Sequence, residues 1–173
     1  MEIVAEILKI CIPSIVVGLT AWLTIESVHK KELKKQLLDY KRRSSEVITP
    51  IRLQAYERVA LLLERIKPES LLLRNQTNML TAAQYRNILL TSLRSEFDHN
   101  LSQQVYISTQ LWEAVKKAKE ETIQTIHLAA GQVGEQANSN DLASKIIQIN
   151  ASLKTQPSDY ALSVLREEIK SIY

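Results

Sequence analysis

Helix-breaking residues are rare along this chain, and their rarity is the strongest constraint on its fold. Only three glycines and four prolines interrupt 173 residues. Because tight turns commonly use these two residues, we expect few turns and long helices. Aromatic residues make up 5% of the chain, whereas a β-sandwich would carry more aromatic and β-branched strands. With 45% hydrophobic residues available for a core, the composition predicts an all-α protein.

The stretch ICIPSIVVGLTAWLTI, residues 10–25, contains no charged side chain. Extended back to Ile3 it reaches 23 residues, interrupted by Glu6 and Lys9. At about 1.5 Å per residue such a helix is about 34 Å long, enough to cross the hydrocarbon core of a bilayer. A cleaved signal peptide and a buried core helix are the competing interpretations. The acidic start and the missing A-x-A site disfavour the first. We therefore predict a transmembrane anchor over residues 1–25.

Basic residues follow this stretch directly. Residues 26–46 hold four acidic residues and seven basic ones: Lys30, Lys31, Lys34, Lys35, Lys41, Arg42 and Arg43. The positive-inside rule places this flank in the cytoplasm. It predicts a single-pass protein of the bacterial inner membrane with its N-terminus outside, whose basic flank contacts the lipid bilayer.

The remaining chain, from residue 47 on, is nearly neutral, which argues against nucleic acid as a partner. Cys11 is the only cysteine, so neither an intrachain disulfide nor a zinc site built on thiolates is possible.

After the anchor we expect a basic juxtamembrane helix over residues 26–48. Its apolar positions follow 4-3-4-3 spacing, a short heptad-like seam formed by Leu33, Leu37, Tyr40, Ser44 and Val47. The seam is expected either to pack on the rest of the chain or to pair with another copy. Thr49-Pro50 is typical of a helix start, because proline disfavours a helical residue before it.

Residues 49–173 are predicted to form a cytoplasmic bundle of about five helices. The first runs from Pro50 to about residue 66. The next begins at Thr81, where Gln84 completes a capping box. Later helices are expected near residues 108–131, 140–154 and 157–173, and the one over 108–131 presents a continuous apolar face.

Glu96 and His99 form E-x-x-H, the spacing with which helix bundles hold iron or manganese. A di-iron site needs two such pairs and two further glutamates. Here His29 lies beside the predicted membrane anchor, and His127 has no glutamate three residues earlier. The helical wheel places Glu96, Asn100 and Gln104 near the buried face, with His99 farther round. We therefore favour a polar seam between helices, or a partner contact, with Arg52 and Arg58 as expected partners of Glu96.

No phosphate-binding loop, dinucleotide fingerprint, zinc-protease motif or nucleophile elbow occurs in the sequence. No cofactor is predicted, and catalysis has no support in the motifs.

Three segments carry a resemblance: RLQAYERVALLLERIKP (52–68), LLLR (71–74) and EFDHNLSQQVYIS (96–108), with LWEAVKKAK shortly after them. With the N-terminal span and its basic flank, the chain resembles an uncharacterised family of small membrane-anchored proteins from Bacteroidetes-type bacteria. The resemblance implies a bacterial membrane protein and no particular activity.

The expected function is a membrane-tethered, non-enzymatic interaction or assembly module. It would bind another membrane or cytoplasmic protein, or itself. The alternatives are a membrane-anchored metalloprotein using Glu96 and His99, or a bundle that binds lipid surfaces.

Overall fold

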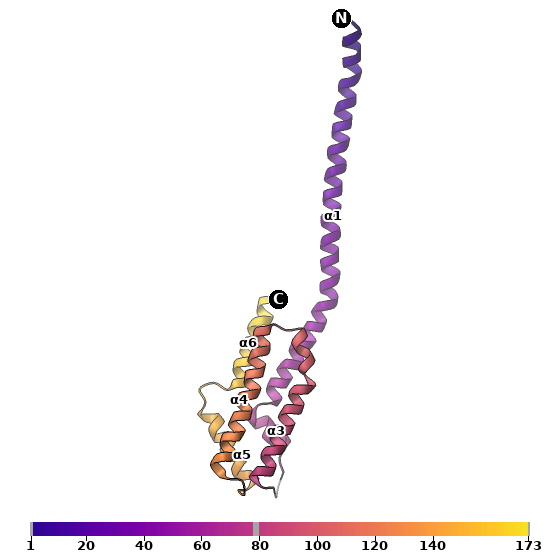
Figure 1. Cartoon of the computed structure of the whole chain (residues 1–173). Helices are drawn as coiled ribbons and strands as arrows, with labels where there is room; N and C mark the ends of the chain where they lie inside the picture. The colour runs from indigo at the N-terminus through magenta and orange to yellow at the C-terminus, as the bar shows by residue number, and fades with distance from the viewer. Residues whose placement is uncertain (1, 78–79, 173) are drawn as a thin grey trace. The chain divides into compact units, whose positions relative to one another are not determined.

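The computed structural model describes residues 2–77 and 80–172, without the side chains of residues 2–17, 21, 37, 41, 44 and 45. It divides into two compact units, Met1–Thr49 and Pro50–Tyr173. Every regular element among the described residues is helical, which confirms the predicted all-α class. The elements are α1 (Glu2–Arg65), α2 (Pro68–Arg74), α3 (Ala82–His99), the 3-10 helix η1 (Leu101–Val105), α4 (Thr109–Val133), α5 (Ser139–Ser152) and α6 (Pro157–Ile172) (Figure 1).

The first unit consists of α1 alone, and residues 26–48 are helical as predicted. Most of the predicted anchor, residues 1–25, consists of residues whose side chains the structure does not describe. Among the residues that are described, no helix is sufficiently long and apolar to cross a membrane. The transmembrane anchor therefore stays a prediction.

The predicted helix start at Thr49-Pro50 is wrong, because α1 continues through both residues to Arg65. Proline inside a helix removes one backbone hydrogen bond. Starting a second helix would require another unfavourable nucleation step, whereas each residue added to an existing helix brings its own hydrogen bond. Continuation of the helix through Pro50 is therefore physically reasonable.

In the second unit, α4 is the central helix and contacts α3, α5 and α6 (Figure 1). Its predicted apolar face is confirmed: Leu111, Val115, Ala118, Thr122, Ile126 and Ala129 are all buried. The part of α1 in this unit also buries one face, formed by Ala55, Tyr56, Val59, Leu62 and Leu63, and Ile66 directly after the helix is buried too. One continuous core results.

Side-chain caps define several helix ends. The predicted capping box of α3 is confirmed, with the hydroxyl of Thr81 accepting from the backbone of Gln84 and the Gln84 side chain accepting from the Thr81 backbone. The cap of α5 is Asn138, slightly earlier than expected, again in a capping box. At the end of α4, Gly134 adopts φ 83°, a conformation that favours glycine.

Helix α3 ends before residue 104, which the helical wheel places on the same helix as Glu96. α3 stops at His99, and η1 continues with the tighter 3-10 winding. Because of this tighter winding, the side chain that points into the core is one residue earlier than a continuous α-helix would place it. Gln103 is buried and Gln104 is exposed, so the prediction that Gln104 lies near the buried face is wrong.

Candidate functional site

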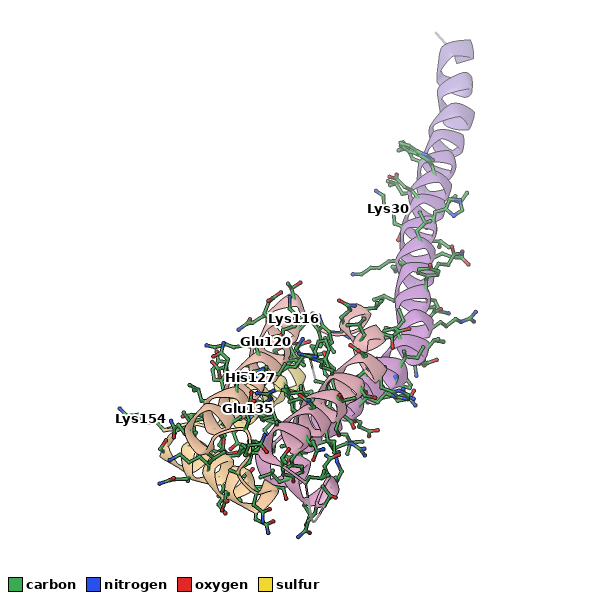
Figure 2. All side chains as sticks on the ribbon, turned by 60° about the horizontal axis from the view of Figure 1, so that its bottom comes forward. Lys30, Lys116, Glu120, His127, Glu135 and Lys154 are labelled. Atoms are coloured by element: carbon green, nitrogen blue, oxygen red, sulfur yellow. The ribbon has the colours of Figure 1, made fainter. Side chains whose placement is uncertain are left out.

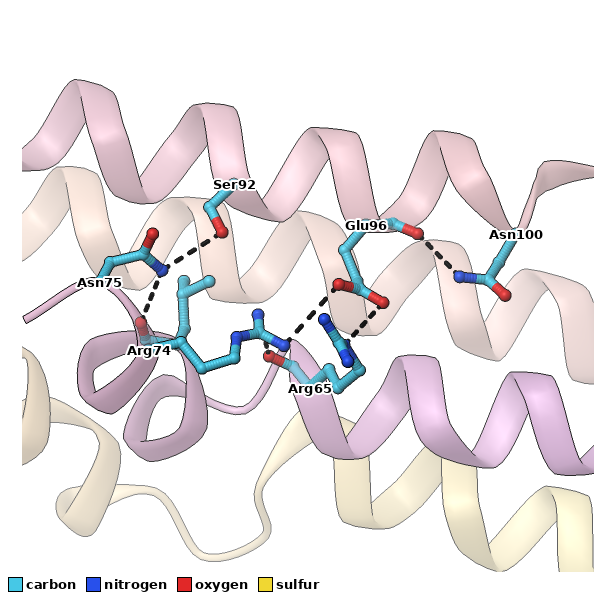
Figure 3. A network of polar contacts seen from close by, with 7 residues as sticks. Arg65, Arg74, Asn75, Ser92, Glu96 and Asn100 are labelled. Carbon is cyan, nitrogen blue, oxygen red and sulfur yellow. Dashed lines mark hydrogen bonds and ion pairs between the residues drawn. The ribbon is translucent and has the colours of Figure 1, made fainter.

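Glu96 lies at the centre of a polar cluster where the ends of α1 and α2 meet α3 (Figure 3). Its Oε1 is 2.8 Å from Nε of Arg65, and its Oε2 is 3.7 Å from a terminal guanidinium nitrogen of Arg74. The Glu96 side chain is 17% exposed, whereas that of Arg65 is 53% exposed. Water therefore screens the guanidinium of Arg65 more than the carboxylate of Glu96.

Two amides extend this cluster along α3 (Figure 3). Nδ2 of Asn75 donates to the carbonyl of Leu71 at 2.8 Å and to Oγ of Ser92 at 3.2 Å. Nδ2 of Asn100 donates to the backbone carbonyl of Glu96 at 2.9 Å. Each asparagine thus donates to a carbonyl in the last turn of a helix, and the Leu71 carbonyl also accepts from the backbone N–H of Asn75. We call Arg65, Arg74, Asn75, Ser92, Glu96 and Asn100 the Glu96 cluster.

The predicted partners of Glu96 lie elsewhere. Arg52 donates to the carbonyl of Tyr106 at 3.2 Å and to the hydroxyl of Tyr56 at 3.0 Å. Arg58 is exposed. The sequence signal that was overlooked is the basic residue in the last turn of α1 and of α2, Arg65 and Arg74, where helix carbonyls favour positive charge.

His99 is exposed at the end of α3, beside a shallow hollow lined by Thr91, Arg94, Ser95 and Asp98. Glu96, three residues earlier, instead faces the two arginines. Both of its carboxylate oxygens are paired with cations, which compete with any metal for the same oxygens. Within the described part of the chain, no group of three or more His, Cys, Asp or Glu residues is placed to hold a metal ion.

A second polar cluster joins α1, α4 and α6, and prediction from sequence missed it. One carboxylate oxygen of Glu168 accepts hydrogen bonds from the Tyr56 hydroxyl at 2.8 Å and from the backbone N–H of Ser108 at 2.9 Å. The other accepts from the Ser108 hydroxyl. With Arg52 and Tyr106 these residues form the Glu168 cluster.

Burial raises the pKa of Tyr56 above its ordinary value of 10.0, and the hydrogen bond to the negative Glu168 raises it further. Arg52 opposes this shift because its positive charge favours the phenolate. The phenol therefore stays protonated at neutral pH and acts as a donor to Glu168.

A hollow beside the Glu168 cluster is lined by Ser108, Gln110, Ser163, Val164, Glu167, Glu168 and Ser171. Its hydroxyls are already engaged. Ser163 donates to the carbonyl of Tyr160 at 2.7 Å, and Ser171 donates to that of Glu168 at 2.7 Å. Ser108 caps α4 by accepting from the N–H of Leu111. These hydrogen bonds cap helix ends or join neighbouring helices. None of them activates a serine as a nucleophile.

A third polar contact also holds the bundle together. Nζ of Lys67 lies 2.9 Å from carboxylate oxygens of both Glu64 and Asp159. Burial disfavours the charged lysine, but the hydrogen bonds to Asp159 and Glu64 outweigh it, so the pKa of Lys67 is raised. This residue links the start of α2 to α6.

The predicted membrane-proximal basic residues lie on α1 in the first unit, and those with described side chains are exposed: Lys30, Lys31, Lys34, Lys35, Arg42 and Arg43. The side chain of Lys41 is outside the description. Lys30, labelled in Figure 2, pairs with Glu26 at 2.7 Å, and Arg42 pairs with Glu46 at 3.2 Å. In the bundle, Glu120 and His127 lie on the exposed side of α4 (Figure 2).

The family of unknown function DUF7935 matches residues 2–172, so the chain belongs to that family. Comparison with curated proteins finds no match. Comparison with solved structures finds none either.

Proposed function

We propose that this member of the family of unknown function is a membrane-tethered interaction or assembly module without enzymatic activity. Residues 1–25 form the anchor of the proposed protein, with the N-terminus outside the bacterial inner membrane. Residues 50–173 form a cytoplasmic helical bundle that meets a partner.

The observation that carries this proposal is the exposure of large apolar side chains along α1 in the first unit. Leu19, Trp22, Leu23, Ile25 and Val28 are each about half exposed or more. Leaving such a side chain in water forgoes about 1.5–3 kcal/mol relative to burying it. A helix that exposes many of them is a surface that binds lipid or protein.

The charges support the proposed direction of insertion. The basic residues begin directly after the exposed apolar residues, as expected of the cytoplasmic side of a span. Each basic residue near an anionic lipid surface contributes about 1 kcal/mol of attraction.

The polar clusters of the bundle support a non-enzymatic role. The carboxylates of Glu96 and Glu168 both bind groups from other helices of the same bundle. Their hydrogen bonds fix helix positions, which is the chemistry of a rigid binding scaffold.

Membrane fractionation of the full-length protein tests the proposal. The full chain should remain in the membrane pellet after alkaline carbonate extraction, and deletion of residues 1–25 should release it. Neutralising the basic residues from Lys30 to Arg43 distinguishes a span from surface binding. A protein held by a spanning anchor stays in the membrane pellet after this neutralisation, whereas a protein bound only to the membrane surface is extracted.

Labelling from outside intact cells tests the orientation. In a Cys11→Ser background, the exposed residue Glu135 is replaced by cysteine. A membrane-impermeant maleimide should label this site only after the cells are broken. Labelling in intact cells would refute the cytoplasmic placement of the bundle.

A further inference from the structure

Pro50 lies inside α1 and changes the backbone hydrogen bonding of the helix around it. Proline has no backbone N–H, so the carbonyl of Glu46 has no N–H four residues later to bind. The proline ring also crowds that carbonyl, and helices bend at such positions. The turn from residue 46 to residue 50 therefore resists bending less than an uninterrupted helical turn.

Burial does not reinforce this turn. From residue 46 to residue 54, where the structure describes every side chain, none is buried. Ile48 and Ile51, on either side of the proline, are 49% and 42% exposed. A segment with few buried apolar contacts opens more easily than a packed one. The division of the chain into two compact units falls at the same place, between Thr49 and Pro50.

The bundle holds α1 from Arg52 onward. Nε of Arg52 donates to the carbonyl of Tyr106 at 3.2 Å, and a terminal nitrogen of the same guanidinium donates to the Tyr56 hydroxyl at 3.0 Å. The first buried side chain of the bundle, that of Ala55, follows three residues later. Because Arg52 is bound to a segment more than 50 positions away in sequence, the part of α1 that is free to bend ends before it.

We propose that α1 bends reversibly at residues 46–51, with Pro50 as the hinge. The helix before the hinge and the bundle after it each keep their own structure while the angle between them changes. The hinge goes beyond the proposed function and does not depend on the membrane tether. In the proposed module it lets the bundle meet a partner from more than one direction.

Distances between two spin labels in the full-length protein, purified in mild detergent, test the hinge. In a Cys11→Ser background, Arg43→Cys and Glu135→Cys place one nitroxide on each side of Pro50, both at exposed positions. Pulsed electron–electron double resonance should give a broad distance distribution. Pro50→Ala should narrow it, because alanine restores the N–H that binds the Glu46 carbonyl. An equal width in both proteins would overturn the hinge, as would a displaced peak of unchanged width, which marks a fixed bend.

Two controls exclude other sources of width. Pro13→Ala makes the same change in α1 but outside the labelled interval, so it should leave the distribution unchanged. A label pair inside the bundle, Asp98→Cys with Glu135→Cys, should give a narrow distribution with or without Pro50. Narrowing by Pro13→Ala, or an equally broad distribution inside the bundle, would overturn the assignment of the width to Pro50.

Arg52→Ala tests where the hinge ends. Without the guanidinium contacts, the first residue of α1 held by the bundle is Ala55, so the distribution between labels at residues 43 and 135 should broaden further. The label pair inside the bundle should stay narrow in this variant, which shows that the bundle remains folded. An unchanged width between residues 43 and 135 would overturn Arg52 as the limit of the hinge.

Discussion

The hydroxyl of Tyr56 donates a 2.8 Å hydrogen bond to the carboxylate of Glu168, across 112 positions of sequence. The same carboxylate accepts from the backbone of Ser108, so it joins the beginning, middle and end of the bundle. Tyr56 is 2% exposed, so this contact links the core to a polar group at its edge. The stability of the bundle should respond to it.

Glu168→Ala should destabilise the bundle by about 1–3 kcal/mol, because it leaves the buried Tyr56 hydroxyl without its acceptor. Urea unfolding of the full-length protein in mild detergent measures the change. In a Trp22→Phe background, the fluorescence of Trp112, buried against Phe97, reports on the bundle alone. Glu167→Ala is the control, since its pair with Lys170 is exposed and worth about 0–1 kcal/mol. Equal effects of the two variants would refute the assignment.

The bundle should lose stability as pH rises above about 10, the ordinary pKa of tyrosine. Burial raises the pKa of Tyr56 in the folded protein, so above pH 10 the unfolded chain binds fewer protons than the folded chain. The free energy of unfolding then falls with rising pH. Tyr85 and Lys67 shift in the same direction.

Urea titrations between pH 9 and pH 11, roughly one unit on either side of the ordinary tyrosine pKa, measure how steeply the free energy of unfolding falls with pH. Tyr56→Phe should make it shallower. An unchanged slope in the variant would show that Tyr56 does not contribute.

Glu96→Ala should cost about 1 kcal/mol, because it leaves the guanidinium groups of Arg65 and Arg74 together without their counter-ion. Asp98→Ala, an exposed acidic residue two positions away, removes the same charge and should be nearly neutral. Unfolding by urea distinguishes them. Elemental analysis of the wild-type protein and the Glu96 variant adds an independent result: a metal lost with Glu96 would restore the metal-site hypothesis.

Gly134→Ala should destabilise the bundle by about 1 kcal/mol, because φ 83° is unfavourable for any residue with a Cβ atom. Gly131→Ala is the matched control inside α4, with no atom near the added methyl group. It should stabilise the helix by up to about 1 kcal/mol. Thermal unfolding of the two variants should therefore shift in opposite directions, and shifts of the same sign would contradict this account.

The helices of the bundle were predictable because local signals define them. Thr81 with Gln84 and Ser108 before the apolar face of α4 mark helix starts by side-chain capping, which depends only on neighbouring residues. The prediction at Pro50 is wrong because the cost of nucleating a second helix outweighs the local preference of proline for a helix start. The failure at Gln104 arose because the wheel assumed one winding through residue 104.

The polar clusters were less predictable. Glu96 and Asn100 were recognised as polar residues near a buried face, but the partners Arg65 and Arg74 come from other helices, and their approach depends on tertiary packing. Glu168 gave no signal at all. Its partners Tyr56 and Ser108 are distant in sequence, and no periodicity relates residues that meet only at the end of a bundle.

The central position of α4 has a consequence for how the bundle can fail. This helix contacts α3, α5 and α6, so a break in the chain anywhere between α3 and α6 separates α4 from at least one neighbour. The buried residues of α1 and α2 belong to the same core, so a break before α3 divides the core as well. We expect unfolding to be all-or-none, so that damage to one helix removes the binding surface entirely and leaves no weakened version of it.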